Sequence, residues 1–212
     1  MEYPIRINKY LRDTGFPSRR EADRLVEAGL VFINGKRAEN GMMVNEKDQV
    51  TVKDEKKQYE YLSYYKPYGL ATQSIDEVKR NGLSAVPELD KESEGLLILT
   101  NDRKFIKEVL SGNKKYEKEY VVSVREHLRA GILPILKSGM QTKDFGKLPS
   151  IKAEIINGTT LRIILNEERG NQIRIMFGEL HSTVVSIKRV RIGDIRLGNL
   201  KPGESRLFIP NK

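Results

Sequence analysis

The stretch VPELDKESEGLLILTND, residues 86–102, carries the side chains whose types and spacing could do chemistry. It gathers four carboxylates immediately before an apolar run: Glu88, Asp90, Glu92 and Glu94. The run itself, residues 96–99, is short and wholly apolar, which is typical of a buried strand. Such a strand would fix the acidic loop ahead of it, so that a carboxylate could serve as a nucleophile or as a metal ligand.

The spacing of these acids partly matches a calcium-binding loop. Asp90 would take position 1, and three later residues match positions 3, 5 and 6: Glu92, Glu94 and Gly95. Position 12 requires a bidentate glutamate but is Asn101, and the positions before it form an apolar strand instead of a ligand loop. We therefore expect no metal here.

The whole chain is basic, although this loop is acidic. Among 212 residues, 38 Lys and Arg oppose 29 Asp and Glu, a formal net charge of +9 that favours a nucleic-acid partner. The chain has no apolar run of membrane-helix length, and its start, MEYPIRINKY, lacks the apolar stretch of a secretory signal. The absence of cysteine excludes disulfides and thiolate metal sites, so we expect a cytoplasmic protein with no membrane segment.

Residues 1–53 have the pattern of a small, largely helical unit. A first helix is predicted in IRINKYLRDTG, where apolar residues recur at helical spacing before Gly15. A second helix would open with Ser18 and Glu21 at capping-box spacing and would end at Gly29. Its buried stripe is predicted to hold three residues: Ala22, Leu25 and Val26. Strands in LVFINGKRA, with a turn at Asn34-Gly35, and in DQVTV would complete the unit.

The charged segment DEKKQ, residues 54–58, is predicted to be a linker to a second domain at residues 59–212. In that domain the pattern predicts strands at 59–65, 95–100, 118–124, 151–165 and 183–197, and helices at 102–112 and 171–180. The 151–165 segment turns at Asn157-Gly158, a strong hairpin signal. Adjacent hairpins predict an α+β fold, in which helices pack on a mainly antiparallel sheet.

The first unit resembles the small RNA-binding domain known from ribosomal protein S-four. The resemblance covers residues 4–52 and rests on Gly-x-Pro-Ser-Arg-Arg-x-x-Ala between the helices and on V-x-I-N-G-K after them. It implies a basic surface that grips structured RNA through phosphate contacts, which position the RNA without reading its sequence. The implied contacts are Arg19, Arg20, Arg24, Lys36 and Arg37.

The acidic loop resembles the active-site motif of the RsuA-type rRNA pseudouridine synthases, G-R-L-D-x-x-[ST]-x-G-L-L-x-L-T-N-D. YKPYG at 65–69 resembles that family's N-K-P-x-G segment, and YEKEYVVSV resembles its K-x-Y-x-V-x-V strand. NQIRIM fits its Q-I-R-R-M helix, and KRVRIGDIRLGNLKPGESRLF fits its C-terminal motif. These segments keep the family's order across nearly the whole chain, and the large-subunit type F branch is the most similar.

This resemblance implies an isomerase that needs neither cofactor nor metal. Asp90 would be the catalytic carboxylate, and Arg174 the cation that keeps it ionised in a pocket that excludes water. Tyr120 would stack on the target base and help with the carbon-5 proton. The uridine would have to flip out of its helix. The resemblance implies a monomer whose partner is structured rRNA, that of the large subunit. Basic residues implied to hold this RNA are Lys66, Lys188, Arg189 and Arg191, with Arg196 beside them.

The chain departs from the family's pattern around this pocket. Glu88 replaces the arginine that normally helps to push the uridine out and takes its place. For a phosphate about 7 Å away at an effective dielectric of about 40, this reversal of charge costs roughly 2 to 3 kcal/mol. Asn171 and Ile175 stand where basic residues are common, and Tyr65 replaces the asparagine of N-K-P.

Two functions therefore remain open from the sequence. Asp90, Tyr120 and Arg174 favour an active synthase that modifies one or a few uridines of rRNA. Glu88 and the loss of basic residues favour a catalytically weak or inactive RNA-binding homologue that acts in ribosome assembly.

Overall fold

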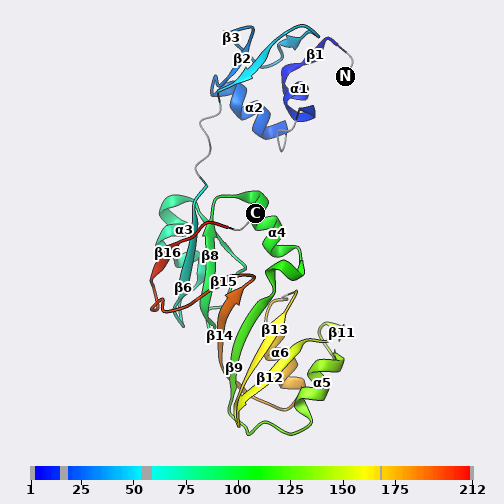
Figure 1. Cartoon of the computed structure of the whole chain (residues 1–212), viewed down its shortest axis with the longest axis vertical. Coiled ribbons are helices and arrows are strands. Elements are labelled where there is room, and N and C mark those ends of the chain that lie inside the picture. The colour runs from blue at the N-terminus through cyan, green and yellow to red at the C-terminus, as the bar shows by residue number, and fades with distance from the viewer. Residues whose placement is uncertain (1–2, 15–18, 54–58, 168, 211–212) are drawn as a thin grey trace. The chain divides into compact units, whose positions relative to one another are not determined.

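A computed structural model describes residues 3–14, 19–53, 59–167 and 169–210, without the side chains of residues 19–21, 80–81 and 114. The chain divides into two compact units, Met1–Gln58 and Tyr59–Lys212 (Figure 1). The predicted linker, residues 54–58, lies outside the described residues. Each unit has its own hydrophobic core, so each is considered by itself.

In the first unit, two helices pack against short strands. These elements are β1 (Ile5–Arg6), α1 (Ile7–Asp13), α2 (Arg19–Glu27), β2 (Val31–Ile33), β3 (Lys36–Arg37), β4 (Met43–Val44) and β5 (Val50–Val52). The predicted stripe of α2 is buried, since Ala22, Leu25 and Val26 are at most 3% exposed. The first helix is shorter than predicted because β1 pairs with β4 ahead of it. Its predicted end at Gly15, and the Ser18 start of α2, lie outside the described residues.

The predicted turn at Asn34-Gly35 joins β2 to β3. Ile33 pairs with Lys36, so the loop has two residues, and both have positive φ, 50° at Asn34 and 77° at Gly35. This is the backbone that a tight antiparallel hairpin requires, and asparagine followed by glycine adopts it at low cost.

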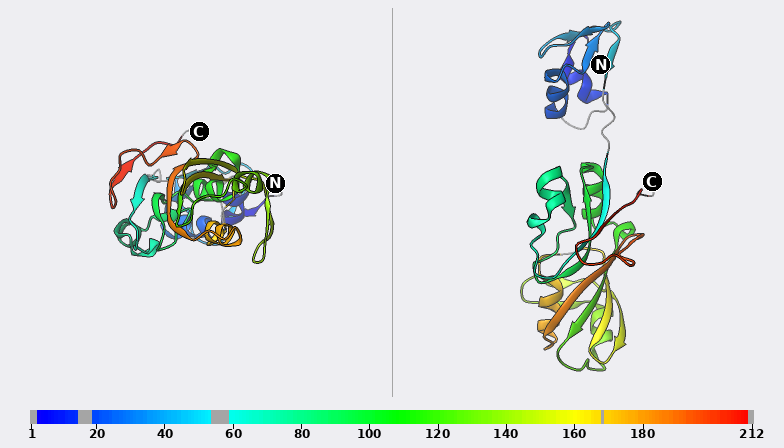
Figure 2. Two further views of the ribbon diagram at one scale, coloured as in Figure 1. Left: turned by 90° about the horizontal axis from the view of Figure 1, so that it is seen from below. Right: turned by 90° about the vertical axis from the view of Figure 1, so that its left-hand side faces the viewer.

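The second unit is built on a large sheet. Its strands are β6 (Tyr61–Lys66), β7 (Ser84–Val86), β8 (Glu94–Thr100), β9 (Lys118–Val124), β12 (Lys152–Asn157), β13 (Thr160–Leu165), β14 (Val184–Ile192), β15 (Ile195–Arg196) and β16 (Ser205–Leu207). The order across the sheet is β12-β13-β9-β14-β8-β6-β16, with β15 on β14 and β7 on β8. All of these pairs are antiparallel except β14 with β8. The predicted α+β class is confirmed (Figure 2).

Helices cover both faces of this sheet. They are α3 (Asp76–Asn81), α4 (Arg103–Leu110), α5 (Ile132–Ser138) and α6 (Gln172–Glu179). Side chains next to α3 and on α5 and α6 share a core with Leu97 and Leu99, whereas Phe105 and Val109 of α4 share another with Leu96 and Ile98. Strand β8 is therefore buried on both faces, which explains why its sequence is continuously apolar instead of alternating.

The predicted helix at 102–112 begins at Asp102, whose carboxylate accepts hydrogen bonds from the backbone N–H groups of Lys104 and Phe105. The predicted hairpin at 151–165 forms, but its two-residue loop is Gly158-Thr159, one residue later than predicted. Asn157 stays in the strand, and its side chain accepts a hydrogen bond from the N–H of Thr159. Its amide thus stabilises the turn from outside the loop.

Several short elements have no counterpart in the predicted pattern. They are α3, α5, β7, β16 and a small hairpin of β10 (Met140–Thr142) and β11 (Gly146–Leu148). Each is seven residues or shorter, too short for a period of 2 or 3.6 to stand out. No helix in the described part of the chain is long and apolar enough to span a membrane.

Gly95 allows the parallel strands β8 and β14 to approach closely. Its φ is +113°, and a Cβ atom built on it would lie 2.2 Å from the carbonyl oxygen of Arg189. Arg189 is the residue paired with Gly95 in the sheet, so no side chain fits between these two backbones. Gly95, the glycine of the acidic motif, is thus needed for β8 to pair with β14 directly after the Asp90 loop.

We predict that Gly95→Ala destabilises the second unit by about 3 kcal/mol or more, because it combines a strained φ with overlap of backbone atoms. Gly131→Ala is the matched control, since nothing lies within 4 Å of the added Cβ and its φ is not positive. Urea unfolding monitored by circular dichroism measures both. Similar midpoints for the two variants would contradict the close approach at Gly95.

Candidate active site

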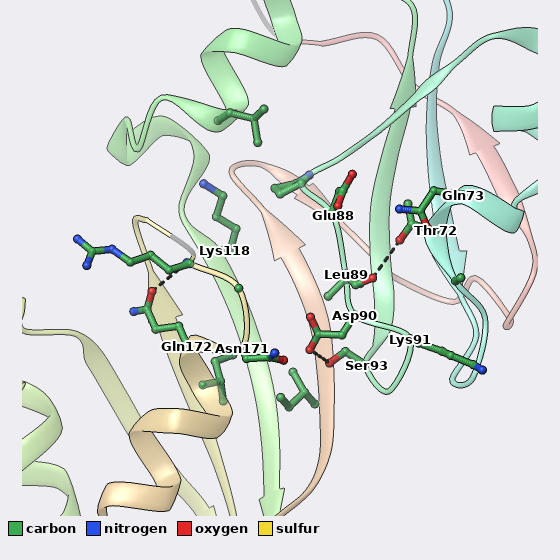
Figure 3. Close-up of a pocket in the computed structure, with 17 residues that line it drawn as sticks. Thr72, Gln73, Glu88, Leu89, Asp90, Lys91, Ser93, Lys118, Asn171 and Gln172 are labelled. Atoms are coloured by element: carbon green, nitrogen blue, oxygen red, sulfur yellow. Dashed lines mark hydrogen bonds between the residues drawn. The ribbon is translucent and has the colours of Figure 1, made fainter. Parts of the chain in front are cut away.

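Asp90 lies in the loop between β7 and β8 and lines a cavity of about 530 Å³. The cavity is bounded by residues 71–73, by residues 87–91 with Ser93, and by residues 169–173, together with Leu110, Lys118 and Ile187. Figure 3 shows Asp90 and Ser93 on one side and Asn171 and Gln172, at the start of α6, across from them. Its volume is that of a small-molecule site and admits a nucleoside.

The Asp90 loop is a tight turn with its own hydrogen bonds. The Asp90 carboxylate accepts a hydrogen bond from the Ser93 hydroxyl at 3.2 Å, and the Asp90 carbonyl accepts one from the Ser93 N–H at 3.1 Å. The carbonyl of the preceding Leu89 accepts from the Thr72 hydroxyl at 3.0 Å. Leu89 and Ser93 are buried, whereas Asp90 is exposed to the cavity. The turn thus presents the carboxylate and anchors its neighbours.

The guanidinium of Arg189 holds this loop from behind. It is fully buried, and its Nε donates to the carbonyl oxygen of Leu96 at 2.7 Å. Its Nη2 donates to the carbonyl of Pro87, and its Nη1 lies 3.4 Å from the carbonyl of Glu88. The planar guanidinium of Arg189 therefore bonds to carbonyls on both sides of the Asp90 loop and so connects the loop to strand β14.

A second buried cation, Lys66, lies on the other side of the loop. Its Nζ donates to the carbonyls of Pro67 and Leu70 at 3.1 and 2.7 Å and lies 3.4 Å from that of Lys91. Burial lowers the pKa of Lys66, and the nearby carboxylates of Asp90 and Glu94 oppose that shift. The Asp90 carboxylate thus favours the charged form of Lys66.

These positions correct three of the predicted RNA contacts. Lys66 and Arg189 are fully buried and bind backbone carbonyls, so they have no surface to offer a phosphate. Arg191 is 15% exposed and forms an ion pair with Glu119 at 2.6 Å. Glu119 is on the neighbouring strand β9 and already compensates the charge of Arg191. Clustering along the sequence did not become clustering on the surface, because a register shift of β14 against β9 between Arg189 and Arg191 interrupts the alternation of its side chains, and Lys66 ends a different strand.

Tyr120 contacts the guanidinium that supports the Asp90 loop. Its ring is fully buried, and its hydroxyl lies 3.4 Å from Nη1 of Arg189. The contact makes Tyr120 part of the support beneath Arg189 and the loop, and the stacking of its ring on the target base stays a prediction.

Arg174 lies on the first turn of α6, beside the Asp90 loop. Its Nη2 donates to the carbonyl oxygen of Glu92 at 2.9 Å. Glu92 is two residues after Asp90, so the predicted cation contacts the loop that carries the predicted carboxylate. In this structure the guanidinium binds the loop backbone and does not pair with the Asp90 carboxylate.

The remaining predicted RNA contacts have different surroundings. Lys188 is half-buried, with its Nζ 4.8 Å from the centre of the Tyr65 ring. In the first unit, Arg24, Lys36 and Arg37 are exposed. The side chains of Arg19 and Arg20 lie outside the described residues.

Several residues at these surfaces were not predicted from the sequence. In the cavity beside Asp90 they are Lys118, Arg169 and Gln172. Lys118 belongs to the K-x-Y strand and Gln172 to the Q-I-R helix, so both stood in recognised motifs without being assigned a role. In the first unit, a hollow of about 520 Å³ is lined by three further cations: Arg6, Lys9 and Arg12. Among the described residues, no group of three or more His, Asp or Glu is arranged to hold a metal ion.

Comparison with known proteins gives the family. Residues 5–50 match the S4 domain, the domain of ribosomal protein S-four, and residues 40–179 match RNA pseudouridylate synthase. The chain belongs to the RNA pseudouridylate synthase family. Its members are isomerases that act on RNA, so the predicted family and enzyme class are confirmed.

Individual relatives agree with this assignment. A protein of Aquifex aeolicus described as an uncharacterized RNA pseudouridine synthase is 33% identical over 95% of this chain and 89% of its own. The dual-specificity RNA pseudouridine synthase RluF of Escherichia coli is 31% identical over 95% and 74% of the two chains. The ribosomal large subunit pseudouridine synthase B of Bacillus subtilis is 28% identical over 98% and 93%. A crystal structure of a pseudouridylate synthase, 23% identical, shares the fold with a TM-score of 0.69 over 97% of this chain and 96% of its own.

Glu88 of this synthase lines the cavity and has an exposed side chain. Its backbone carbonyl is the group that faces Arg189. The backbone at this position is therefore fixed by the loop, while the side chain is free of that constraint. The negative charge of Glu88 therefore lies in the lining of the cavity.

We predict that Arg189→Lys lowers the free energy of unfolding of the synthase by about 2 kcal/mol, because one ammonium cannot satisfy carbonyls on both sides of the loop. Arg191→Lys, in the same strand, keeps its partly exposed ion pair with Glu119 and should cost under about 1 kcal/mol. Urea unfolding compares the two variants, and hydrogen exchange reports whether residues 88–93 loosen only in Arg189→Lys. Equal losses would contradict a special role for Arg189.

Proposed function

We propose that this synthase converts specific uridines of structured large-subunit rRNA to pseudouridine, with Asp90 as its catalytic carboxylate. The observation that carries the proposal is the exposure of Asp90 to a nucleoside-sized cavity by a loop whose neighbouring residues are anchored. The rRNA target is supported by the name of the Bacillus subtilis relative, a large-subunit enzyme.

The reaction needs a nucleophile and a rotation of the base. The bond between ribose carbon 1′ and uracil nitrogen 1 breaks, the base turns, and carbon 1′ bonds to carbon 5. The proton on carbon 5 then leaves to solvent, and nitrogen 1 takes up a proton, so that the product is an isomer of the substrate. Asp90 would attack ribose or base and be released when the new bond forms. The reaction is an isomerisation, so it consumes no oxidant or reductant.

A carboxylate nucleophile must stay ionised after the uridine displaces water from the cavity. We assign this task to Arg174 and Lys66. Arg174 lies beside the loop through its bond to Glu92, and the buried charge of Lys66 interacts with the Asp90 carboxylate. Tyr120 would be a positioning residue that acts through Arg189.

The first unit would bind the RNA backbone. Arg24, Lys36 and Arg37 are exposed, so their charges would attract phosphates, and the hollow lined by Arg6, Lys9 and Arg12 adds positive charge. Binding through such contacts releases counterions, so the affinity for rRNA should fall steeply with added salt.

Glu88 supports a second function, that of an RNA-binding homologue with weak catalysis that acts in ribosome assembly. A carboxylate at the cavity entrance repels the phosphates of an approaching strand. Three Lys and Arg side chains line the same cavity against the carboxylates of Glu88 and Asp90: Lys91, Lys118 and Arg169. The cavity therefore keeps an excess of positive charge, which favours the enzyme.

Tritium release from carbon-5-labelled uridine in rRNA transcripts tests the proposed function. The wild-type protein should release tritium from large-subunit transcripts, and Asp90→Asn, which keeps the shape of the side chain, should lower the rate by more than about a thousandfold. Glu92→Gln is the control, because it removes a nearby exposed carboxylate that does not line the cavity. Retained binding without release by the wild-type protein would favour the assembly function, and release from small-subunit transcripts alone would exclude the large-subunit target.

Removing the charge of Glu88 should help catalysis. Glu88→Gln is expected to raise kcat/KM by about fivefold to tenfold, because it eliminates one unit of repulsion near phosphate. The gain should shrink in high salt, where the repulsion is screened. An unchanged kcat/KM would mean that the charge of Glu88 does not oppose the reaction. A lower kcat/KM would mean that Glu88 takes part in recognition of the RNA.

A further inference from the structure

A paired or stacked uridine must leave its neighbours before it can enter the cavity, and a protein side chain commonly holds the gap open. This synthase has Glu88 where its relatives' motif has an arginine, and a carboxylate is a poor group to place inside a nucleic-acid stack. A replacement would have to reach the cavity entrance from another part of the second unit.

The cations that line the cavity are engaged elsewhere. Lys118 is buried, and its Nζ donates to the carbonyls of Val109 and Asn166, each at 3.1 Å. The Arg169 guanidinium lies 5.6 Å from the centre of the Phe145 ring. The Lys91 side chain points away from Asp90 (Figure 3).

Leu110 stands out among the apolar side chains of the cavity. Pro87, Leu89, Ile173 and Ile187 are buried, and they form its wall. Leu110 lines the same cavity but is 56% exposed. Exposing a leucine at the entrance to a polar cavity has no benefit for folding, whereas a leucine is among the apolar side chains that proteins insert between bases.

The helix that carries Leu110 is firmly held. Leu110 is the last residue of α4, whose first turn is capped by Asp102 and whose Phe105 and Val109 are buried in the core. The carbonyl of Val109, next to Leu110, accepts the hydrogen bond from Lys118. A side chain mounted in this way can push against a base stack without yielding.

We propose that Leu110 inserts into the gap that the target uridine leaves in its RNA helix, in place of the missing arginine. This inference rests on the proposed function. It makes Leu110 a positioning residue that lowers the cost of extruding the uridine and has no part in the bond exchange at Asp90. It also explains how a synthase with Glu88 can act on structured RNA.

The test compares Leu110→Ala with the wild-type protein on two forms of one substrate. The rRNA fragment that releases most tritium is used as a folded duplex and as the same uridine-bearing strand without its complement. We expect Leu110→Ala to lose about tenfold or more in kcat/KM on the duplex but less than about threefold on the single strand, where little unstacking is needed. Leu110→Met, which keeps a long apolar side chain, should restore most of the activity.

Val185→Ala is the matched control, because Val185 is 57% exposed but does not line the cavity. It should leave both rates unchanged. Equal losses by Leu110→Ala on both RNAs, or no loss on either, would overturn the role of Leu110 while leaving the synthase activity established. If the wild-type protein released no tritium from either RNA, the proposed function itself would fail, and the role of Leu110 with it.

Discussion

The site depends on a buried guanidinium between two parallel strands. Arg189 donates hydrogen bonds to carbonyls of Pro87 and Leu96, which flank the Asp90 loop in sequence. It can do so only because Gly95, its partner in the sheet, has no side chain. Because unpaired buried carbonyls are costly, this network sets the loop's conformation before any RNA arrives. Lys66 completes it from the other side.

Much of the chain's positive charge is therefore used inside the protein. Arg189, Lys66 and Lys118 are buried and solvate carbonyls, and Arg191 is paired with Glu119. A net charge of +9 overstates what an RNA can meet on the surface of the second unit. The first unit, by contrast, has exposed cations on its helices and hairpin. This agrees with the proposal that the first unit binds the RNA backbone and the second unit carries the chemistry.

Backbone and side chain have separate roles at position 88. The carbonyl of Glu88 faces Arg189, so the loop keeps its form whichever residue stands there. The side chain is exposed, so its replacement changes the electrostatics of the entrance without disturbing Asp90. This independence means that the side chain at position 88 can differ from the family's motif without cost to the fold, which is consistent with the proposed role of Leu110.

Motifs and spacing along the chain were enough to predict the family, the buried stripe of the second helix, the α+β class and the acidic loop before a buried strand. These features are local or are carried by motifs. Which basic residues reach the surface depended on the fold, because Arg189 and Lys66 are buried by carbonyls of other segments and β14 shifts its register against β9 between Arg189 and Arg191. The tertiary structure likewise decided that Tyr120 lies behind the site and that Leu110, 20 residues from Asp90 in sequence, lines its cavity. Contacts between distant segments set these positions, and no single segment encodes them.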